Sequence, residues 1–231
     1  MSELILALDV PRASDAFRLL ERVPELRWVK VGPILMTREG PEFVRTLADR
    51  GLKVFLDLKW HDIPNTVAGA VAAARELGVS MATVHVLGGS AMLEAAVDAA
   101  GGDLAIIGVT VLTSHDRASY AHTIGRHEVD LYQEVERQAM IAAQAGLRGI
   151  VCSPLEVSLL RRRVGPALYI VVPGIRRHSD PAGDQARVAS AKDAASNGAT
   201  HLVVGRPILE ANDPAAVLEE LMKEARCTTS G

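Results

Sequence analysis

The chain has 231 residues, of which 48% are hydrophobic and 23% charged, and 25 Lys and Arg against 28 Asp and Glu give it a formal net charge of −3. This composition is typical of a soluble globular protein, and it argues against binding to nucleic acid or to a membrane through bulk charge. No apolar stretch has the length of a membrane span. The two cysteines, Cys152 and Cys227, are too few for a disulfide framework and lack zinc-site spacing, so we expect a cytoplasmic protein.

Eight short apolar runs recur along the chain, and most are separated by stretches with helical spacing. The runs are Leu4–Leu8, Trp28–Val31, Val54–Leu58, Met81–Val86, Leu104–Val109, Gly149–Cys152, Tyr169–Val172 and His201–Val204. A glycine that fits a helix C-cap precedes a run at four places, Gly51, Gly78, Gly146 and Gly198. Eight strand and helix units predict an α/β fold, a single-domain (β/α)8 TIM barrel over residues 1–225, with a doubly wound open sheet as the alternative.

Three local features refine this prediction. The interval between the fifth and sixth runs is longer than the others, and its polar stretch Thr113–Asp130 predicts an extended loop or a short additional helix. Helix starts are indicated by Ser153-Pro154-Leu155-Glu156 and by Asp213-Pro214. We expect residues 226–231 to form a disordered tail.

Charged residues follow the first three predicted strands, at the barrel end where active sites of this fold lie. The first strand ends at Asp9, the second contains Lys30, and the third ends in Asp57-Leu58-Lys59 with Asp62 just beyond. Asp57 and Lys59 point to the same face because strand side chains alternate. Buried charges are costly unless they are paired, so we expect Lys30, Asp57, Lys59 and Asp62 to form one alternating network. A purely structural ion-pair network is the alternative, but four charges at strand ends favour a catalytic site.

The loops after the seventh and eighth strands each combine a glycine with an arginine, Gly174 with Arg176 and Gly205 with Arg206. Barrels with phosphorylated substrates commonly bind the phosphate there, so these loops predict a phosphate site. The alternative is that Gly205 serves a tight turn and Arg206 is a surface residue. His85, in the fourth run, is interpreted as a histidine lining the core, because no Ser or Cys nucleophile accompanies it.

The segment Asp57-Leu58-Lys59-Trp60-His61-Asp62-Ile63-Pro64-Asn65-Thr66 resembles the D-x-K-x-x-D-I-P-x-T signature of the orotidine 5′-phosphate decarboxylase family, bacterial type. The resemblance covers essentially the whole chain and includes Leu8-Asp9, Lys30-Val31-Gly32, Leu112-Thr113-Ser114, Val172-Pro173-Gly174-Ile175-Arg176, Gly183-Asp184-Gln185 and Val204-Gly205-Arg206-Pro207-Ile208. It implies decarboxylation of orotidine 5′-monophosphate to uridine 5′-monophosphate in pyrimidine biosynthesis, with no metal and no organic cofactor.

The resemblance also implies roles for individual residues. Lys59 would protonate C6, Asp57 would lie beside the leaving carboxylate, and Lys30 and Asp62 would keep Lys59 charged and oriented. The residues implied to bind substrate are Asp9, Lys30, Ile63, Thr66, Thr113, Ser114, Pro173, Arg176, Gln185, Gly205 and Arg206. The family pattern further implies a homodimer in which Asp62, Ile63 and Thr66 reach the neighbouring subunit's site.

Two alternative functions remain open at this point. A magnesium-dependent 3-keto-gulonate-phosphate decarboxylase or hexulose-phosphate synthase of the same superfamily would share the D-x-K-x-x-D pattern. A non-catalytic phosphate-binding barrel would share the two Gly and Arg loops. The acidic and basic set around Lys59 argues against the second alternative, because binding alone has no use for a carboxylate beside an anionic ligand.

Overall fold

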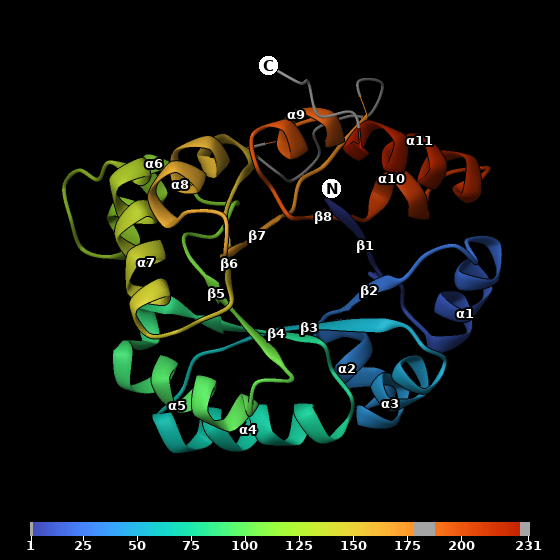
Figure 1. The fold of residues 1–231 in the computed structure, drawn as a ribbon, viewed down its shortest axis with the longest axis horizontal. Coiled ribbons are helices and arrows are strands. Elements are labelled where there is room, and N and C mark those ends of the chain that lie inside the picture. Colours follow the sequence, from blue (N-terminus) through green and yellow to red (C-terminus); the bar gives the residue numbers. More distant parts are fainter. Residues whose placement is uncertain (1, 178–187, 227–231) are drawn as a thin grey trace.

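The computed structural model describes residues 2–177 and 188–226, and its strands form a closed parallel barrel (Figure 1). The strands are β1 (Glu3–Ala7), β2 (Trp28–Val31), β3 (Lys53–Trp60), β4 (Met81–His85), β5 (Ala105–Val109), β6 (Gly149–Val151), β7 (Tyr169–Val172) and β8 (His201–Val204). Each strand pairs with the next in the sequence, and β8 pairs with β1, with Ile5 opposite Val203. This closure confirms the predicted TIM barrel and excludes the open sheet.

The helices form a ring around the barrel (Figure 1). They are α1 (Ala13–Arg22), α2 (Pro33–Glu39), α3 (Pro41–Asp49), α4 (Pro64–Glu76), α5 (Ser90–Ala100), α6 (Arg117–Thr123), α7 (Leu131–Gln144), α8 (Val157–Val164), α9 (Ala191–Ser196), α10 (Arg206–Leu209) and α11 (Pro214–Arg226), with short 3-10 helices η1 (Val86–Gly88) and η2 (Pro154–Glu156). Helix α6 is the additional helix that the polar stretch before β6 predicts. None of the helices in the described part of the chain is long and apolar enough to cross a membrane.

The helix ends that the sequence indicates are found in the structure. The four glycines predicted as C-caps all have positive φ, between 78° and 102°. Ser153 is the N-cap of η2, and its backbone N–H donates to Glu156 Oε2 at 2.7 Å. Asp213 Oδ1 accepts a hydrogen bond from the N–H of Ala216 in the first turn of α11. Helix α11 includes Arg226, the first residue of the expected tail, and residues 227–231 lie outside the described residues.

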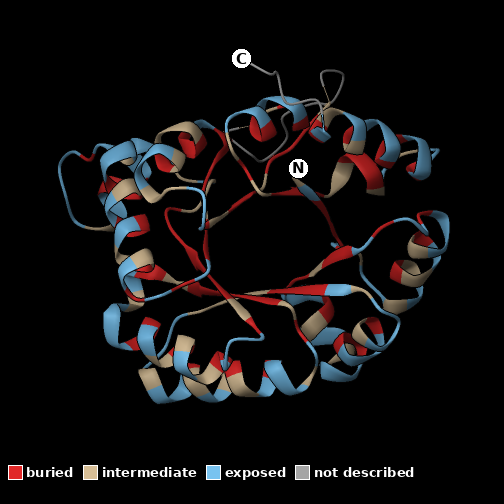
Figure 2. Ribbon diagram, in the orientation of Figure 1, coloured by how far each residue is buried: buried red, intermediate tan, exposed pale blue. Residues whose placement is uncertain are grey.

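The hydrophobic core has two layers, because alternate residues of each strand point inward and outward. The outer layer packs the strands against the helices, and most strand residues are buried (Figure 2). The inner layer fills the barrel with Ile5, Ala7, Trp28, Phe55, Met81, Ile107, Val171 and Val203. This inner layer closes the barrel interior beneath the carboxyl ends of the strands, where the charged side chains lie.

Candidate active site

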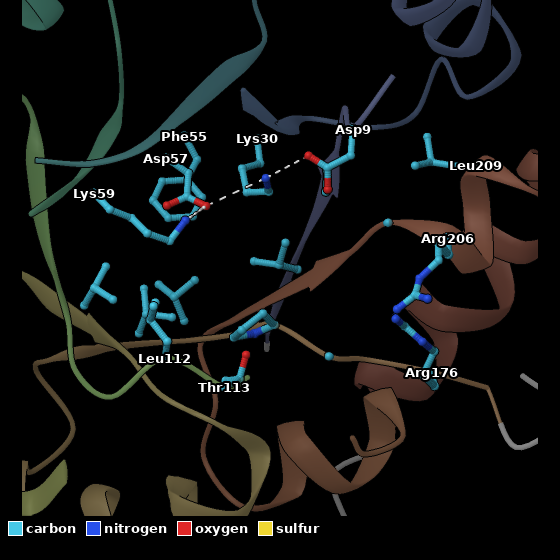
Figure 3. A pocket seen from close by; sticks show the side chains of 18 of the residues that line it. Asp9, Lys30, Phe55, Asp57, Lys59, Leu112, Thr113, Arg176, Arg206 and Leu209 are labelled. Atoms are coloured by element: carbon cyan, nitrogen blue, oxygen red, sulfur yellow. Dashed lines mark hydrogen bonds and ion pairs between the residues drawn. The ribbon is translucent and has the colours of Figure 1, made fainter. Parts of the chain in front are cut away.

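A cavity of about 530 Å³ lies at the carboxyl ends of the strands (Figure 3). Four members of the inner core layer form its apolar floor, namely Ala7, Phe55, Val171 and Val203. The sequence-predicted site residues that line it are Asp9, Lys30, Asp57, Lys59, Thr113, Pro173, Arg176, Gly205 and Arg206. The fold therefore brings together the charged strand ends of β1 to β3 and the glycine and arginine loops after β7 and β8.

Alternating charges run along one side of this cavity. The Lys59 ammonium lies 2.9 Å from Asp57 Oδ2, Lys30 Nζ lies 3.7 Å from the same oxygen, and Lys30 Nζ also lies 3.1 Å from Asp9 Oδ1 (Figure 3). The two central side chains, Lys30 and Asp57, are only 12% and 13% exposed. An alternating network of two acids and two amines therefore exists, and it contains three of the four predicted members, namely Lys30, Asp57 and Lys59.

The fourth member of this network differs from the expected residue, Asp62. Asp9, which contacts Lys30, is the second acid of the network, whereas the exposed Asp62 carboxylate accepts a hydrogen bond from the N–H of Ile63 at 2.6 Å. The physical reason is the local chain path: β3 ends at Trp60, and the chain then turns into α4 at Pro64. Within one chain, Asp62 does not line the cavity.

The charges around Asp57 decide its protonation state. Burial raises the pKa of the Asp57 carboxyl, but the nearby charges of Lys30 and Lys59 and the hydrogen bonds from Lys59 and Thr83 outweigh this effect. The pKa of Asp57 consequently lies below its ordinary value of 3.8. At neutral pH the cavity thus holds a buried carboxylate anion between two ammonium groups.

Lys59 has an unusual backbone conformation. Its φ is +52°, and among the described residues it is the one non-glycine residue with positive φ. The pairing of β3 with β4 shifts register between Leu56 and Trp60, and within this irregular segment the N–H of Lys59 donates to Thr83 Oγ1 at 2.8 Å. Left-handed backbone at a non-glycine residue costs on the order of 1 kcal/mol and is characteristic of functional sites. Lys59, at one end of the network, therefore has a strained backbone.

Thr83 is a site residue that the sequence analysis missed. It lies in β4, is fully buried, and donates from Oγ1 to Asp57 Oδ1 at 3.0 Å. The available signal is a single hydroxyl within the otherwise apolar segment Met81-Ala82-Thr83-Val84. Because threonine is also a favourable strand residue, this signal alone does not indicate a function.

Two arginines lie on the other side of the cavity. Arg176 is 8% exposed, its Nη1 donates to the carbonyl of Ile175 at 2.8 Å, and its backbone N–H donates to the carbonyl of Ala189 at 3.0 Å. Arg206 is the first residue of α10, and Figure 3 shows its guanidinium group next to that of Arg176, away from Lys59. The two predicted phosphate loops therefore converge on one end of the cavity, and Glu210, which the sequence analysis did not single out, also lines it.

The other predicted binding residues have different positions. Thr113 and Leu112 line the cavity, whereas Ser114 is exposed and does not. Ile63, with 67% of its surface exposed, and Thr66 lie on the molecular surface at the start of α4, next to Asp62. Gln185 lies outside the described residues.

His85 is a partly buried histidine at the end of β4. Burial and the charges of His61 and Lys59 lower its pKa, although the charge of Asp57 opposes them, so its ring is neutral at pH 7. Its ring centroid lies 5.7 Å from that of His61, and its buried Nδ1 has no hydrogen-bond partner among the described residues. His85 does not line the cavity, which agrees with its interpretation as a packed histidine.

The chain is similar to known proteins over nearly its whole length. The family described as "Orotidine 5'-phosphate decarboxylase / HUMPS family" matches residues 2–221. The proteins named "Orotidine 5'-phosphate decarboxylase" from Alkalilimnicola ehrlichii and Halorhodospira halophila are each 48% identical to this chain, and the matches cover 96% of this chain and 96% and 94% of theirs. A crystal structure with that name from Lactobacillus acidophilus superposes with a TM-score of 0.88 at 35% identity, covering 98% of this chain and 100% of that one.

Proposed function

This chain belongs to the orotidine 5′-phosphate decarboxylase / HUMPS family and is a decarboxylase of the lyase class, and from this premise we propose that it converts orotidine 5′-monophosphate to uridine 5′-monophosphate in pyrimidine biosynthesis without a metal or organic cofactor. One observation carries the proposal: a buried Asp57 carboxylate held between two lysines at one end of a cavity, with two arginines at the other end. This arrangement suits a substrate with a carboxylate at one end and a phosphate at the other. The presence of only two cysteines supports the cytoplasm as its compartment.

The chemistry centres on Lys59. When the bond between C6 and the carboxylate carbon breaks, carbon dioxide leaves and the electron pair stays on C6, in an orbital that the pyrimidine ring does not delocalise. The Lys59 ammonium stabilises this developing charge and then transfers a proton to C6, and the neutral amine regains a proton from solvent. A side chain that is 36% exposed can both approach the substrate and exchange protons with water.

Asp57 and Lys30 have supporting roles in this proposal. The ionised Asp57 lies beside the leaving carboxylate, where repulsion between like charges raises the energy of the bound substrate relative to the transition state. Lys30 keeps Asp57 ionised and, together with Asp57, keeps the Lys59 ammonium in one orientation. The lowered pKa of Asp57 supports this assignment, because a protonated Asp57 would provide neither effect.

Further residues bind the rest of the substrate in this proposal. Asp9 and Lys30 bind the ribose hydroxyl groups, and the phosphate is bound by Arg206 and the backbone N–H of Gly205, with Arg176 beside them. Thr113 and Pro173, which line the cavity, contact the substrate. The family resemblance assigns the pyrimidine edge to Ser114, which is exposed next to Thr113, and the bridge between base and phosphate to Gln185.

We further propose that the active unit is a homodimer in which Asp62, Ile63 and Thr66 enter the neighbouring subunit's cavity. Two observations support this: these residues are exposed in one chain, and Ile63 is a large apolar side chain with two thirds of its surface in contact with solvent. In the dimer, Asp62 would join the network of the partner from the outside and pair with its Lys59. Symmetric dimers make such an exchange reciprocal, so each site would be completed by the other chain.

The decisive experiment measures the loss of orotidine 5′-monophosphate absorbance with wild-type enzyme in excess EDTA. We expect turnover to be retained, and we expect Lys59→Ala to lower it by at least about three orders of magnitude while thermal unfolding stays cooperative. Lys53→Ala is the matched control, because Lys53 begins the same strand at its opposite end and should leave turnover unchanged. Turnover that requires magnesium would favour the related sugar-phosphate lyases instead. A Lys59→Ala enzyme within about tenfold of wild type would exclude Lys59 as the proton donor.

A further inference from the structure

The hydroxyl group of Thr83 joins the two residues at the centre of the network. Its Oγ1 accepts a hydrogen bond from the backbone N–H of Lys59 at 2.8 Å and donates one to Asp57 Oδ1 at 3.0 Å. The directions are fixed by chemistry: the ionised carboxylate can only accept, so the single hydroxyl proton points to Asp57, and an oxygen lone pair receives the Lys59 N–H. One fully buried side chain thus contacts the backbone of the proposed proton donor and the side chain of its neighbouring anion.

We propose that Thr83 is a positioning residue of this active site, which fixes both the left-handed backbone of Lys59 and the orientation of the Asp57 carboxylate. The inference deepens the proposed function and rests on it. It assigns a role in the reaction to a residue of β4 that does not itself line the cavity.

The backbone of Lys59 depends on its surroundings. A non-glycine residue at a φ of +52° is retained only where its surroundings hold it. Regular pairing of β3 with β4 is interrupted between Leu56 and Trp60, and in this gap the Lys59 N–H is bound by the Thr83 hydroxyl. This contact holds the Lys59 backbone where its ammonium can meet Asp57 at the cavity rim.

The same hydroxyl group orients the Asp57 carboxylate. Because Thr83 occupies Oδ1, the other oxygen Oδ2 is the one that faces the two ammonium groups, at 2.9 Å from Lys59 and 3.7 Å from Lys30. Rotation of the carboxylate would break the Thr83 bond and one lysine contact together. The Thr83 hydroxyl group therefore leaves Asp57 Oδ2 as the oxygen that both lysines contact.

The protein contains a matched control for this hydroxyl. Thr200, just before β8, accepts a hydrogen bond from the N–H of Ile170 at 2.9 Å and so bridges β7 and β8, as Thr83 bridges β3 and β4. It lies at the amino end of its strand, opposite the cavity. Its loss would remove a comparable inter-strand bond without touching the charge network.

The test compares Thr83→Val, Thr83→Ser and Thr200→Val in the wild-type background. We expect Thr83→Val to lower kcat by ~30-fold, or about 2 kcal/mol at 1.36 kcal/mol per factor of ten, which is typical of losing a hydrogen bond to a charged group. KM should change by less than about threefold, because the residue does not line the cavity. Thr83→Ser, which keeps the hydroxyl, should recover most of the turnover, and Thr200→Val should lower the unfolding midpoint while retaining kcat.

The pH profile gives a readout that a purely structural role would not move. The Thr83 hydrogen bond helps lower the pKa of Asp57, so its loss in Thr83→Val should shift the acid limb of kcat/KM to higher pH, and Thr83→Ser should restore it. An unshifted limb with kcat within about threefold of wild type would overturn the inference. So would a Thr83→Ser enzyme as impaired as Thr83→Val.

A second measurement separates this inference from the proposed function. In protein labelled with ¹⁵N-lysine, the Lys59 amide should exchange with solvent at least about tenfold faster in Thr83→Val than in wild type, whereas Thr200→Val should leave it unchanged. If the wild-type enzyme did not act on orotidine 5′-monophosphate, the proposed function would fail, yet amide exchange would still decide whether Thr83 holds Lys59. Unchanged exchange would overturn the positioning role.

Discussion

Replacing Asp57 by Asn removes the negative charge between two ammonium groups while keeping the shape of the side chain. Lys59 and Lys30 lie 2.9 and 3.7 Å from one carboxylate oxygen, so their nitrogens are no more than about 6.6 Å apart. At an effective dielectric constant of about 20, two like charges at that separation repel by about 2.5 kcal/mol. The substitution therefore changes an alternating network into one with adjacent positive charges.

The expected loss of stability follows from this repulsion and from the lost attraction. Breaking a buried ion pair by removing one partner costs about 3–5 kcal/mol, and the partial exposure of Lys59 screens some of this cost. We therefore expect the free energy of unfolding of Asp57→Asn to be about 3 kcal/mol below that of wild type. High salt should reduce the difference, because ions screen the lysines.

Urea unfolding measured at low and high salt provides the assay. The double variant Asp57→Asn with Lys59→Met should be more stable than Asp57→Asn alone, because it removes one of the two repelling charges. Asp98→Asn, at an exposed position on α5, is the matched control and should change stability by less than about 0.5 kcal/mol. If Asp57→Asn unfolded at the same urea concentration as wild type, and Lys59→Met added nothing, the charges would not be energetically coupled and the reasoning would fail.

Two further predictions concern assembly and pH. Mixing Lys59→Ala with Asp62→Ala chains should restore about a quarter of wild-type turnover, since half of the dimers would be hybrids with one intact site, and no recovery would exclude the exchange of Asp62 between subunits. Burial, with the nearby charge of Lys53, lowers the pKa of His201 to about 4 from its ordinary 6.5, so the unfolded chain takes up this proton first on acidification. Between about pH 6.5 and 4, the unfolding free energy of wild type should thus fall by about 3 kcal/mol more than that of His201→Phe. Urea titrations at several pH values measure this difference, and equal losses in both proteins would contradict the assignment.

The barrel was predictable from the sequence because its strands are buried on both faces and appear as short apolar runs. The predicted second, seventh and eighth runs coincide with β2, β7 and β8. β3 differs, because it begins at Lys53 and continues to Trp60, past the predicted end at Leu58. Its extension depends on the irregular pairing with β4, which arises from tertiary contacts and leaves no periodic signal.

The site was predictable to the extent that strand ends carry charge. Residues two apart on one strand had to share a face, so Asp57 and Lys59 were expected together and are paired at 2.9 Å. Asp62 lies beyond the end of β3, where strand alternation no longer fixes the direction of a side chain, and it does not join the network of its own chain. Thr83 was not predictable, because its partners lie on a neighbouring strand and a buried threonine has many structural roles.

The separation of the two charged ends of the cavity follows from the closure of the barrel. Strands β1 to β3 supply Asp9, Lys30, Asp57 and Lys59, whereas the arginines follow β7 and β8, which close the ring on the other side of β1. Gly205 lies where a Cβ atom would be 3.6 Å from Ala7 on β1, so the loop after β8 packs directly against the strand that leads to Asp9. The distance between the two ends is therefore set by strand pairing. A substrate with a carboxylate and a phosphate at that distance would be aligned with Lys59 by the barrel framework, and the strain at Lys59 would be supported by the same framework through β4.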